Sequence, residues 1–245
     1  MIPLRDINPT RRVPVVTIIL IAINAIVFLV QQSLSERELQ RFVFQYGLMP
    51  AAVTGNFDQS AYTFVTSMFL HGDWLHIGSN MLYLWIFGNN IEDRLGIVRF
   101  VLFYFLTGFA AAGAQIAIDP HSETPMIGAS GAIAGVLGAY VVLFPNARVQ
   151  TLVFFFYFIR VIEVSAVWLL GWWFLLQVLY GVGSLGLEQA GGVAFFAHIG
   201  GFATGWLLIR ILTAGRPGRQ AADDLSFQTV DDVFRQRRGR DRWWE

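Results

Sequence analysis

The stretch of sequence that says most about the fold is residues 127–144, which read IGASGAIAGVLGAYVVLF. It holds no charged side chain, and glycine recurs along it at Gly128, Gly131, Gly135 and Gly138. A helix needs about 20 mostly apolar residues to cross the hydrocarbon core of a bilayer. We therefore interpret this stretch as a membrane-spanning helix with a face of small residues.

Five further stretches have the same character, and together the six predict an all-α polytopic membrane protein with six transmembrane helices in one bundle. The chain of 245 residues is 55 % hydrophobic and 14 % charged, whereas soluble domains carry about 25 % charged residues. This composition argues against an ordinary soluble globule and against disorder over most of the chain. The expected spans are residues 14–30, 75–91, 98–118, 127–144, 165–182 and 193–212.

The spans divide the chain into an N-terminus at residues 1–13, a membrane core at residues 14–212 and a polar C-terminal tail at residues 213–245. The first span is not expected to be a cleaved signal peptide, because no small-residue cleavage site follows it and five more spans do. Two apolar stretches are not expected to span. Residues 42–66 contain helix breakers and predict a loop lying partly in the membrane, and residues 151–162 predict an interfacial segment.

Arginine supplies all 17 basic side chains and indicates the orientation of the chain. Loops rich in positive charge stay in the cytoplasm. With six spans, only Arg37 and Arg41 fall on the outer side, so both termini are expected in the cytoplasm. The all-arginine usage is typical of a bacterial protein, which places the chain in a bacterial inner membrane, with lipids as partners and no nucleic acid. The fifteen arginines on the inner side are Arg5, Arg11, Arg12, Arg94, Arg99, Arg148, Arg160, Arg210, Arg216, Arg219, Arg235, Arg237, Arg238, Arg240 and Arg242.

Strongly polar side chains within spans are costly and are functional candidates by default. His76 and Asn80 lie near the start of the second span, Ser130 near the start of the fourth, and His198 within the sixth. A spacing of four puts His76 and Asn80 on one helix face. Tracing the chain through the membrane places all four side chains near the outer ends of their helices, so we expect them to meet at one level.

Glycines give the helices the means to approach each other. Gly201 and Gly205 form a GxxxG pattern in the sixth span, opposite the glycines of the fourth. Small residues at this spacing let helix backbones pack closely, and in many spans they do no more than that. Beside a serine and a histidine at matching depth, they favour a site built between the two helices.

Three blocks of this sequence resemble those of a known family. They are HGDWLHIGSN (71–80), GASGAIAG (128–135) and AHIGGFATG (197–205). In order and spacing they resemble the signature blocks of the rhomboid intramembrane serine proteases. The resemblance covers roughly residues 14–212, and EDRLG (92–96) after the second span is similar as well. One departure concerns the loop before the second span, where many members carry a Trp-Arg pair and this chain reads Ala-Tyr-Thr.

The resemblance implies an endopeptidase that cuts transmembrane helices of membrane proteins near their outer ends, without a cofactor or metal. It implies that Ser130 is the nucleophile and His198 the general base of a Ser–His dyad. It assigns His76 and Asn80, with the backbone N–H of Ser130, to the oxyanion hole, and His71 to a supporting position. The packing positions beside the site match Gly128, Gly131, Gly201 and Gly205.

The chemistry of the residues agrees with this assignment. Serine is a weak nucleophile until a base takes its proton, and a neutral imidazole can do so within about 2.6–3.2 Å. No carboxylate lies in a span at a suitable depth, so we expect a dyad whose imidazole is oriented by packing. The absence of cysteine and lysine excludes a cysteine nucleophile and a Ser–Lys dyad.

Three other function classes remain open. A rhomboid-like pseudoprotease that binds or escorts membrane helices is expected to have lost the serine or the histidine, and this chain keeps both. A zinc site from His71, His76 and His198 would lack carboxylate or thiolate support, and the HExxH motif of metalloproteases is absent. A small-solute transporter is disfavoured because the sequence shows no internal repeat and no intramembrane charge pair.

Overall fold

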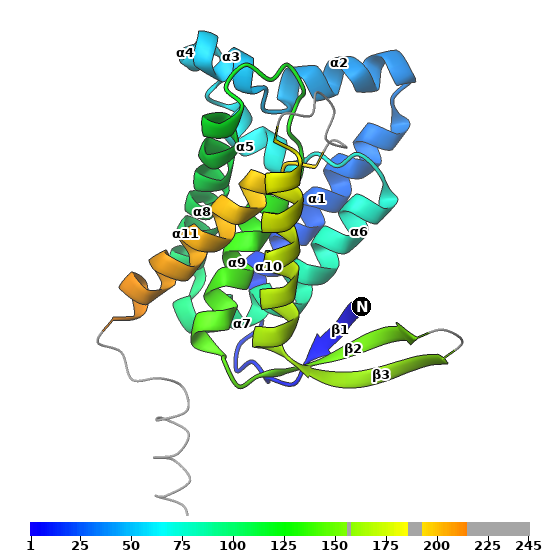
Figure 1. The fold of residues 1–245 in the computed structure, drawn as a ribbon. Helices are drawn as coiled ribbons and strands as arrows, with labels where there is room; N and C mark the ends of the chain where they lie inside the picture. Colours follow the sequence, from blue (N-terminus) through cyan, green and yellow to red (C-terminus); the bar gives the residue numbers. More distant parts are fainter. Residues whose placement is uncertain (156–157, 186–192, 215–245) are drawn as a thin grey trace, which may run out of the picture. The chain divides into compact units, whose positions relative to one another are not determined.

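The computed structural model describes residues 1–155, 158–185 and 193–214 (Figure 1). The predicted C-terminal tail lies almost wholly outside the described residues. The described chain is mostly helical, as predicted, and residues 1–212 form one compact unit. The α-helices are α1 (Val15–Ser33), α2 (Glu36–Tyr46), α3 (Pro50–Gly55), α4 (Phe57–Ser60), α5 (Thr63–Thr66), α6 (Trp74–Tyr83), α7 (Asn89–Leu95), α8 (Ile97–Ile118), α9 (Ser130–Leu143), α10 (Ala166–Gly183) and α11 (Phe195–Thr213).

Four of the described helices, α1, α8, α10 and α11, are long and apolar enough to cross a membrane. They coincide with the predicted first, third, fifth and sixth spans. The predicted second span is helical, but a π-helical turn, η2 (Leu84–Gly88), separates α6 from α7. The predicted fourth span corresponds to α9, which has 14 residues and begins at Ser130. The chain is thus an integral membrane protein with a helical bundle.

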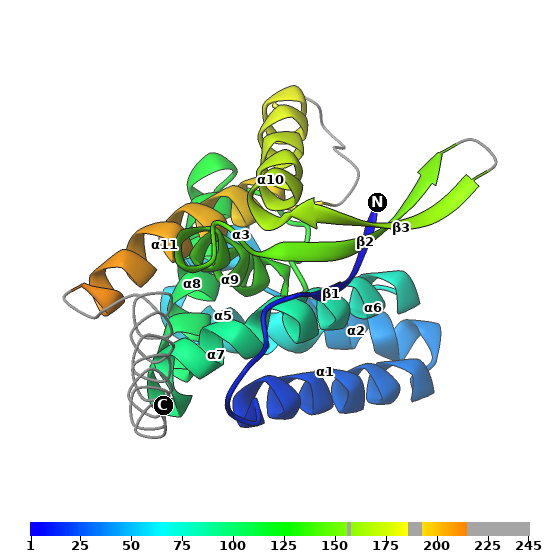
Figure 2. The ribbon, with the colours of Figure 1, turned by 90° about the horizontal axis from the view of Figure 1, so that it is seen from below.

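Helix α9 lies at the centre of this bundle. Every residue from Ala132 to Tyr140 is buried, and α6, α8, α10 and α11 lie around α9 in views turned by 90° (Figures 1 and 2). A helix that is apolar on all sides finds its low free energy when it is surrounded by other helices. Ser130, the first residue of α9, therefore belongs to a tightly packed helix.

A buried carboxylate from another helix caps the N-terminus of α1. Pro14 precedes α1 without a side-chain cap, so the first N–H groups of the helix need other acceptors. Glu92 of α7, which is 4 % exposed, accepts hydrogen bonds of 2.8 Å from the N–H groups of Val16 and Thr17 and from the Thr17 hydroxyl. Negative charge is also favourable at a helix N-terminus. Glu92 is the first residue of the EDRLG block, and its hydrogen bonds link α7 to α1.

Residues 42–66 are not the loop that the sequence predicted, because they belong mostly to the short helices α2 to α5. The helix breakers mark the ends of these helices instead. Helix α2 ends before Gly47, and α3 ends at Gly55. Asn56 then begins α4, and its side chain accepts a hydrogen bond from the Gln59 N–H at 3.3 Å.

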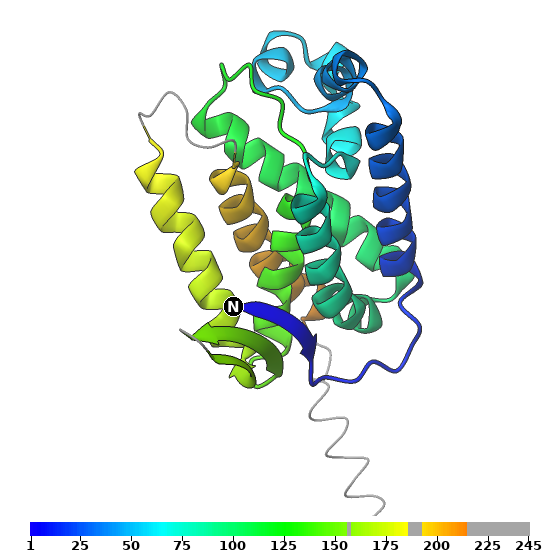
Figure 3. The same ribbon diagram turned by 90° about the vertical axis from the view of Figure 1, so that its right-hand side faces the viewer.

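The all-α prediction is wrong at one end of the bundle, where a three-stranded antiparallel sheet lies (Figure 3). The described residues of the predicted interfacial segment, 151–155 and 158–162, belong to two antiparallel strands. Their β-branched and aromatic side chains favour the extended backbone. The N-terminus of the chain adds the third strand, in the order β1-β2-β3. The strands are β1 (Ile2–Asp6), β2 (Arg148–Phe155) and β3 (Phe158–Ser165).

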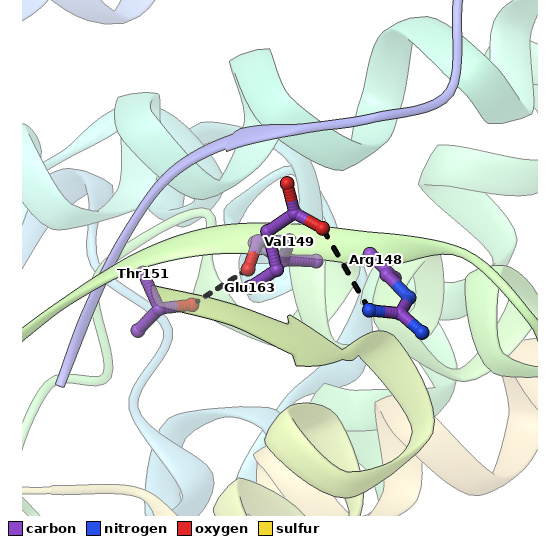
Figure 4. Close-up of polar contacts among 4 residues, drawn as sticks. All are labelled: Arg148, Val149, Thr151 and Glu163. Atoms are coloured by element: carbon purple, nitrogen blue, oxygen red, sulfur yellow. Dashed lines mark hydrogen bonds and ion pairs between the residues drawn. The ribbon is translucent and has the colours of Figure 1, made fainter. Parts of the chain in front are cut away.

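Polar contacts hold β2 and β3 together where they join the helices (Figure 4). The Arg148 guanidinium lies 3.8 Å from the Glu163 carboxylate across β2 and β3. The buried Thr151 hydroxyl donates a hydrogen bond to the Val149 carbonyl at 3.1 Å, so it is satisfied within its own strand. The charged pair is well exposed and contributes about 0–1 kcal/mol. Strand β3 leads directly into α10, so these two strands fix the start of that helix.

Candidate active site

Ser130 occupies the first position of α9, directly after a turn that requires glycine. Gly128 has φ +118°, a conformation that side-chain-bearing residues rarely adopt, and its N–H donates to the Ser67 carbonyl at 2.9 Å. Ala129 then takes the N-cap position. The N–H of Ser130 is among the first N–H groups of the helix, which have no acceptor within it. The residue after this turn, Ser130, therefore carries both the hydroxyl and a backbone N–H that has no acceptor within α9.

His198 of α11 faces Ser130. Its Nε2 atom lies 2.8 Å from the Ser130 Oγ atom, which is hydrogen-bonding distance. The two residues are 68 positions apart in the sequence and come from different helices. Both are partly exposed, so the pair is held by the protein without being sealed from the surroundings. The serine and histidine that the sequence predicted to meet are brought together.

Glycines bring α9 and α11 close enough for this contact. A Cβ atom on Gly201 would overlap the carbonyl oxygen of Gly131, and a Cβ atom on Gly205 would overlap that of Gly135. On the opposing helix, a Cβ atom on Gly138 would overlap the carbonyl oxygen of Phe202. The two backbones thus approach directly at three positions, Gly131, Gly135 and Gly138 of α9, which span about two turns. Any larger side chain at these positions would push His198 away from Ser130.

The second ring nitrogen of His198 has a partner that the sequence analysis missed. Its Nδ1 atom lies 2.7 Å from the Oε1 atom of Gln177 on α10. The ring of Trp173, one turn earlier on α10, lies 5.8 Å from the imidazole, centroid to centroid. The prediction that packing alone orients the imidazole is therefore incomplete. Gln177 is a strongly polar side chain within a predicted span, so the rule that selected His198 could have selected it too.

His76 and Asn80 of α6 lie against the turn that precedes Ser130. A Cβ atom on Gly128 would be 2.7 Å from His76 Nε2 and 3.7 Å from Asn80 Nδ2, so both nitrogens flank this glycine. The Gly72 N–H donates to His76 Nδ1 at 3.4 Å, which leaves the proton of a neutral ring on Nε2. Asn80 is 6 % exposed, and its Nδ2 has no hydrogen-bond partner among the described residues. Two side-chain nitrogens thus lie beside the turn before α9, and that of Asn80 has no hydrogen-bond partner among the described residues.

His71 lies behind His76 as a second layer. It is 1 % exposed, and its ring meets that of His76 edge-on at 4.9 Å. Its backbone exchanges two hydrogen bonds of 3.1 Å with the side-chain amide of Gln31 on α1. Burial lowers the pKa of His71 to about 4, so the ring is neutral at pH 7. The structure therefore places His71 beside the site, in contact with His76 and one layer away from Ser130.

The three histidines weighed as a zinc site are not arranged as one. Among the residues that the structure describes, no three His, Asp or Glu side chains gather in a way that could hold a metal ion. His198 contacts Ser130 and Gln177, while His71 and His76 contact each other.

Comparison with known proteins decides the family. The model of the Rhomboid domain matches residues 58–215, which is more than half of the 245 residues and contains all three signature blocks. The chain belongs to the rhomboid family. This confirms the resemblance that the three blocks carry, and the apolar helices agree with a membrane-embedded rhomboid.

Curated relatives include a rhomboid protease and an inactive rhomboid. This rhomboid is 32 % identical over 118 residues to Rhomboid protein 1, mitochondrial, of Saccharomyces cerevisiae, covering 46 % of this chain and 33 % of that protein. It is 39 % identical over 75 residues to Rhomboid protease GluP of Bacillus subtilis, covering 31 % and 14 %. It is 28 % identical over 97 residues to Inactive rhomboid protein 1 of Drosophila melanogaster, covering 40 % and 7 %. The alignments span a third or less of each relative's length.

Proposed function

We propose that this rhomboid is an intramembrane serine endopeptidase that cuts transmembrane helices of membrane proteins near their outer ends. The observation that carries the proposal is the 2.8 Å contact between Ser130 Oγ and His198 Nε2. A serine becomes a nucleophile when a base within hydrogen-bonding distance takes its proton. The contact brings together the two groups that the first step needs: a hydroxyl, and a ring nitrogen that can accept the hydroxyl proton.

In the proposed reaction, Ser130 Oγ attacks the scissile carbonyl carbon while His198 Nε2 accepts the hydroxyl proton. His198 then gives this proton to the leaving amine, and the amine departs from an acyl-enzyme on Ser130. A water molecule attacks the acyl carbon, His198 takes its proton, and the Ser130 oxygen leaves and is protonated again. Each half of the reaction passes through a tetrahedral oxyanion.

The donors around Gly128 fit the oxyanion. The backbone N–H of Ser130, the Nε2–H of His76 and the Nδ2 of Asn80 all flank the turn before the nucleophile. The unpartnered Asn80 amide matters most to this argument, because a buried donor without a partner costs free energy until an acceptor arrives. One such donor is worth about 2.7–4 kcal/mol to a transition state.

The proposed placement in the membrane is a six-span bundle with residues 14–212 as the catalytic core. The second span would comprise α6, η2 and α7, and the fourth would be α9. A helix of 14 residues is about 21 Å long, while the hydrocarbon core is about 30 Å thick. Because α9 is short, Ser130 would lie below the outer surface, as cleavage of a helix end requires. The distribution of arginine supports cytoplasmic termini in a bacterial inner membrane.

The alternative is a pseudoprotease that binds membrane helices without cutting them. One relative, from Drosophila, is named an inactive rhomboid, so a rhomboid without activity is a real alternative. Against this alternative, both the serine and the histidine are present here and lie in contact.

The first test is cleavage in liposomes. Purified protein is reconstituted with a panel of single-span substrates, and fragments are mapped by mass spectrometry. We expect wild-type protein to cut within the substrate helix near its outer end and Ser130→Ala to cut none. Binding of substrates by the wild type without any fragment would favour the pseudoprotease.

A second prediction concerns the substrate. A helix keeps its scissile carbonyl in a hydrogen bond that hydrocarbon cannot replace, so cleavage requires local unwinding. Glycine and proline lower the helix stability by about 1 and 3 kcal/mol relative to alanine. We expect substrates with these residues near the cut to turn over faster, and their replacement by leucine to slow cleavage. Equal rates for a poly-leucine helix and its glycine-containing counterpart, measured in the same liposomes, would refute this selection rule.

A further inference from the structure

Helix α10 supplies the hydrogen-bond partner of the second ring nitrogen of His198. Gln177 Oε1 lies 2.7 Å from His198 Nδ1, on the side of the ring opposite to Ser130. We propose that Gln177 is a positioning residue, which fixes the tautomer and the orientation of the His198 ring. This inference rests on the proposed function.

A neutral imidazole has two ring nitrogens, of which one donates a hydrogen bond and the other accepts one. An amide oxygen can only accept, so its 2.7 Å contact requires the proton to lie on Nδ1. The Nε2 atom then carries the lone pair and faces the Ser130 hydroxyl at 2.8 Å. This is the tautomer that can take the serine proton. The other tautomer would present an N–H to the hydroxyl oxygen and could not act as a base.

The contacts of α10 explain how the amide is held in place. Trp173, one turn before Gln177, packs on the His198 ring, and Phe174 stacks on Phe202 of α11 at 4.4 Å. The imidazole therefore rests against two consecutive turns of one helix face. These aromatic contacts seat α10 on α11, so the orientation of the base depends on α10 remaining in its place.

A neutral partner also suits the location. A carboxylate at this depth would be costly to bury, whereas an amide selects the tautomer without a charge. When the ring becomes an imidazolium, the same oxygen still accepts the Nδ1 proton. Through the Oε1 contact with Nδ1, Gln177 thus does part of what an aspartate does in a Ser–His–Asp triad, which is to hold the imidazole in the tautomer that can accept the serine proton.

The test uses Gln177→Met, which keeps the length of the side chain but removes the acceptor, and Gln177→Glu, which replaces the amide with a carboxylate. Leu179→Met is the matched control, because Leu179 is exposed on the same helix. We expect Gln177→Met to lower kcat about 10- to 100-fold with KM unchanged, since a general base supplies about 10²–10⁴-fold in all. The control should retain the wild-type kcat.

Gln177→Glu provides the readout that a purely structural role would not move. A negative charge beside the ring favours the imidazolium, so the acidic limb of the kcat/KM profile should move to higher pH by about 1–3 units. At pH values above that limb, Gln177→Glu should recover most of the activity that Gln177→Met loses. An unchanged kcat in Gln177→Met, or an unmoved acidic limb in Gln177→Glu, would overturn the inference.

Ser130→Ala in the same assay separates the two levels of the argument. Cleavage by Ser130→Ala would mean that the proposed function itself is wrong. An inactive Ser130→Ala together with a fully active Gln177→Met would leave the proposed function standing and remove the role of Gln177 alone.

Discussion

Replacement of Ser130 by alanine is expected to lower the cleavage rate by about 10⁴-fold or more, and His198→Ala by a similar factor. The double variant should be no slower than either single variant. The physical reason is that both side chains serve one step, the transfer of the hydroxyl proton across the 2.8 Å contact. Once one partner is missing, the other has nothing left to contribute. Cleavage of a membrane-spanning substrate in liposomes measures all three rates.

Matched controls lie outside the site. Ser33→Ala removes an exposed hydroxyl that donates to the Val30 carbonyl within α1, and His121→Ala removes an exposed ring on the loop before α9. Both should cleave at the wild-type rate. If the effects of Ser130→Ala and His198→Ala multiplied in the double variant, the two residues would act in separate steps and the dyad would be wrong.

The second large effect is expected from one added methyl group between α9 and α11. In Gly201→Ala the new Cβ atom would overlap the carbonyl oxygen of Gly131, the residue after Ser130, so the helices must separate. Overpacking of this kind costs about 1–3 kcal/mol of stability. A displacement of about 1 Å at reacting groups can cost about 10²-fold in rate. We therefore expect Gly201→Ala to lower cleavage by about 10²-fold or more, and Gly205→Ala to act in the same direction.

Gly113→Ala on α8 is the control, because a Cβ atom there meets no atom within 4 Å. In a helix, alanine is favoured over glycine by about 0.8–1.0 kcal/mol. The control should therefore be as stable as the wild type or more so, with full activity. Thermal unfolding in mild detergent and cleavage are measured for each variant. Wild-type activity in Gly201→Ala would show that the close approach of the two helices is not needed for the dyad.

The sequence predicted the helical part of the fold well, because the signal there is simple. A long apolar run bounded by polar residues defines a helix of the bundle, and the expected span 98–118 agrees with α8 within one residue. The sheet was missed for a physical reason. Its strands β1 and β2 are separated by more than 140 residues, and such long-range pairing leaves no local pattern. Residues 151–162 do have strand-like composition, but the membrane context favoured another interpretation.

The site was predictable to a similar degree. Ser130 and His198 stood out because polar side chains are rare in spans, and the glycines on α9 and α11 predicted the close approach that the structure has. Gln177 was passed over, although it is a polar side chain in the expected fifth span and the rule that selected Asn80 applies to it as well. Its role depends on which face of α10 meets α11, and a uniformly apolar helix such as α10 gives no sequence pattern from which that face can be deduced.

The most direct measurement of the central claim is covalent labelling of the protein in liposomes with a fluorophosphonate, which reacts only with an activated serine. The modified residue is identified by mass spectrometry of digested protein, and the labelling rate is followed over time. A Ser130–His198 dyad should give a single adduct on Ser130 in the wild type, none in Ser130→Ala, and labelling of His198→Ala slower by about 10²-fold or more. An adduct on another residue, or undiminished labelling of Ser130 in His198→Ala, would contradict it.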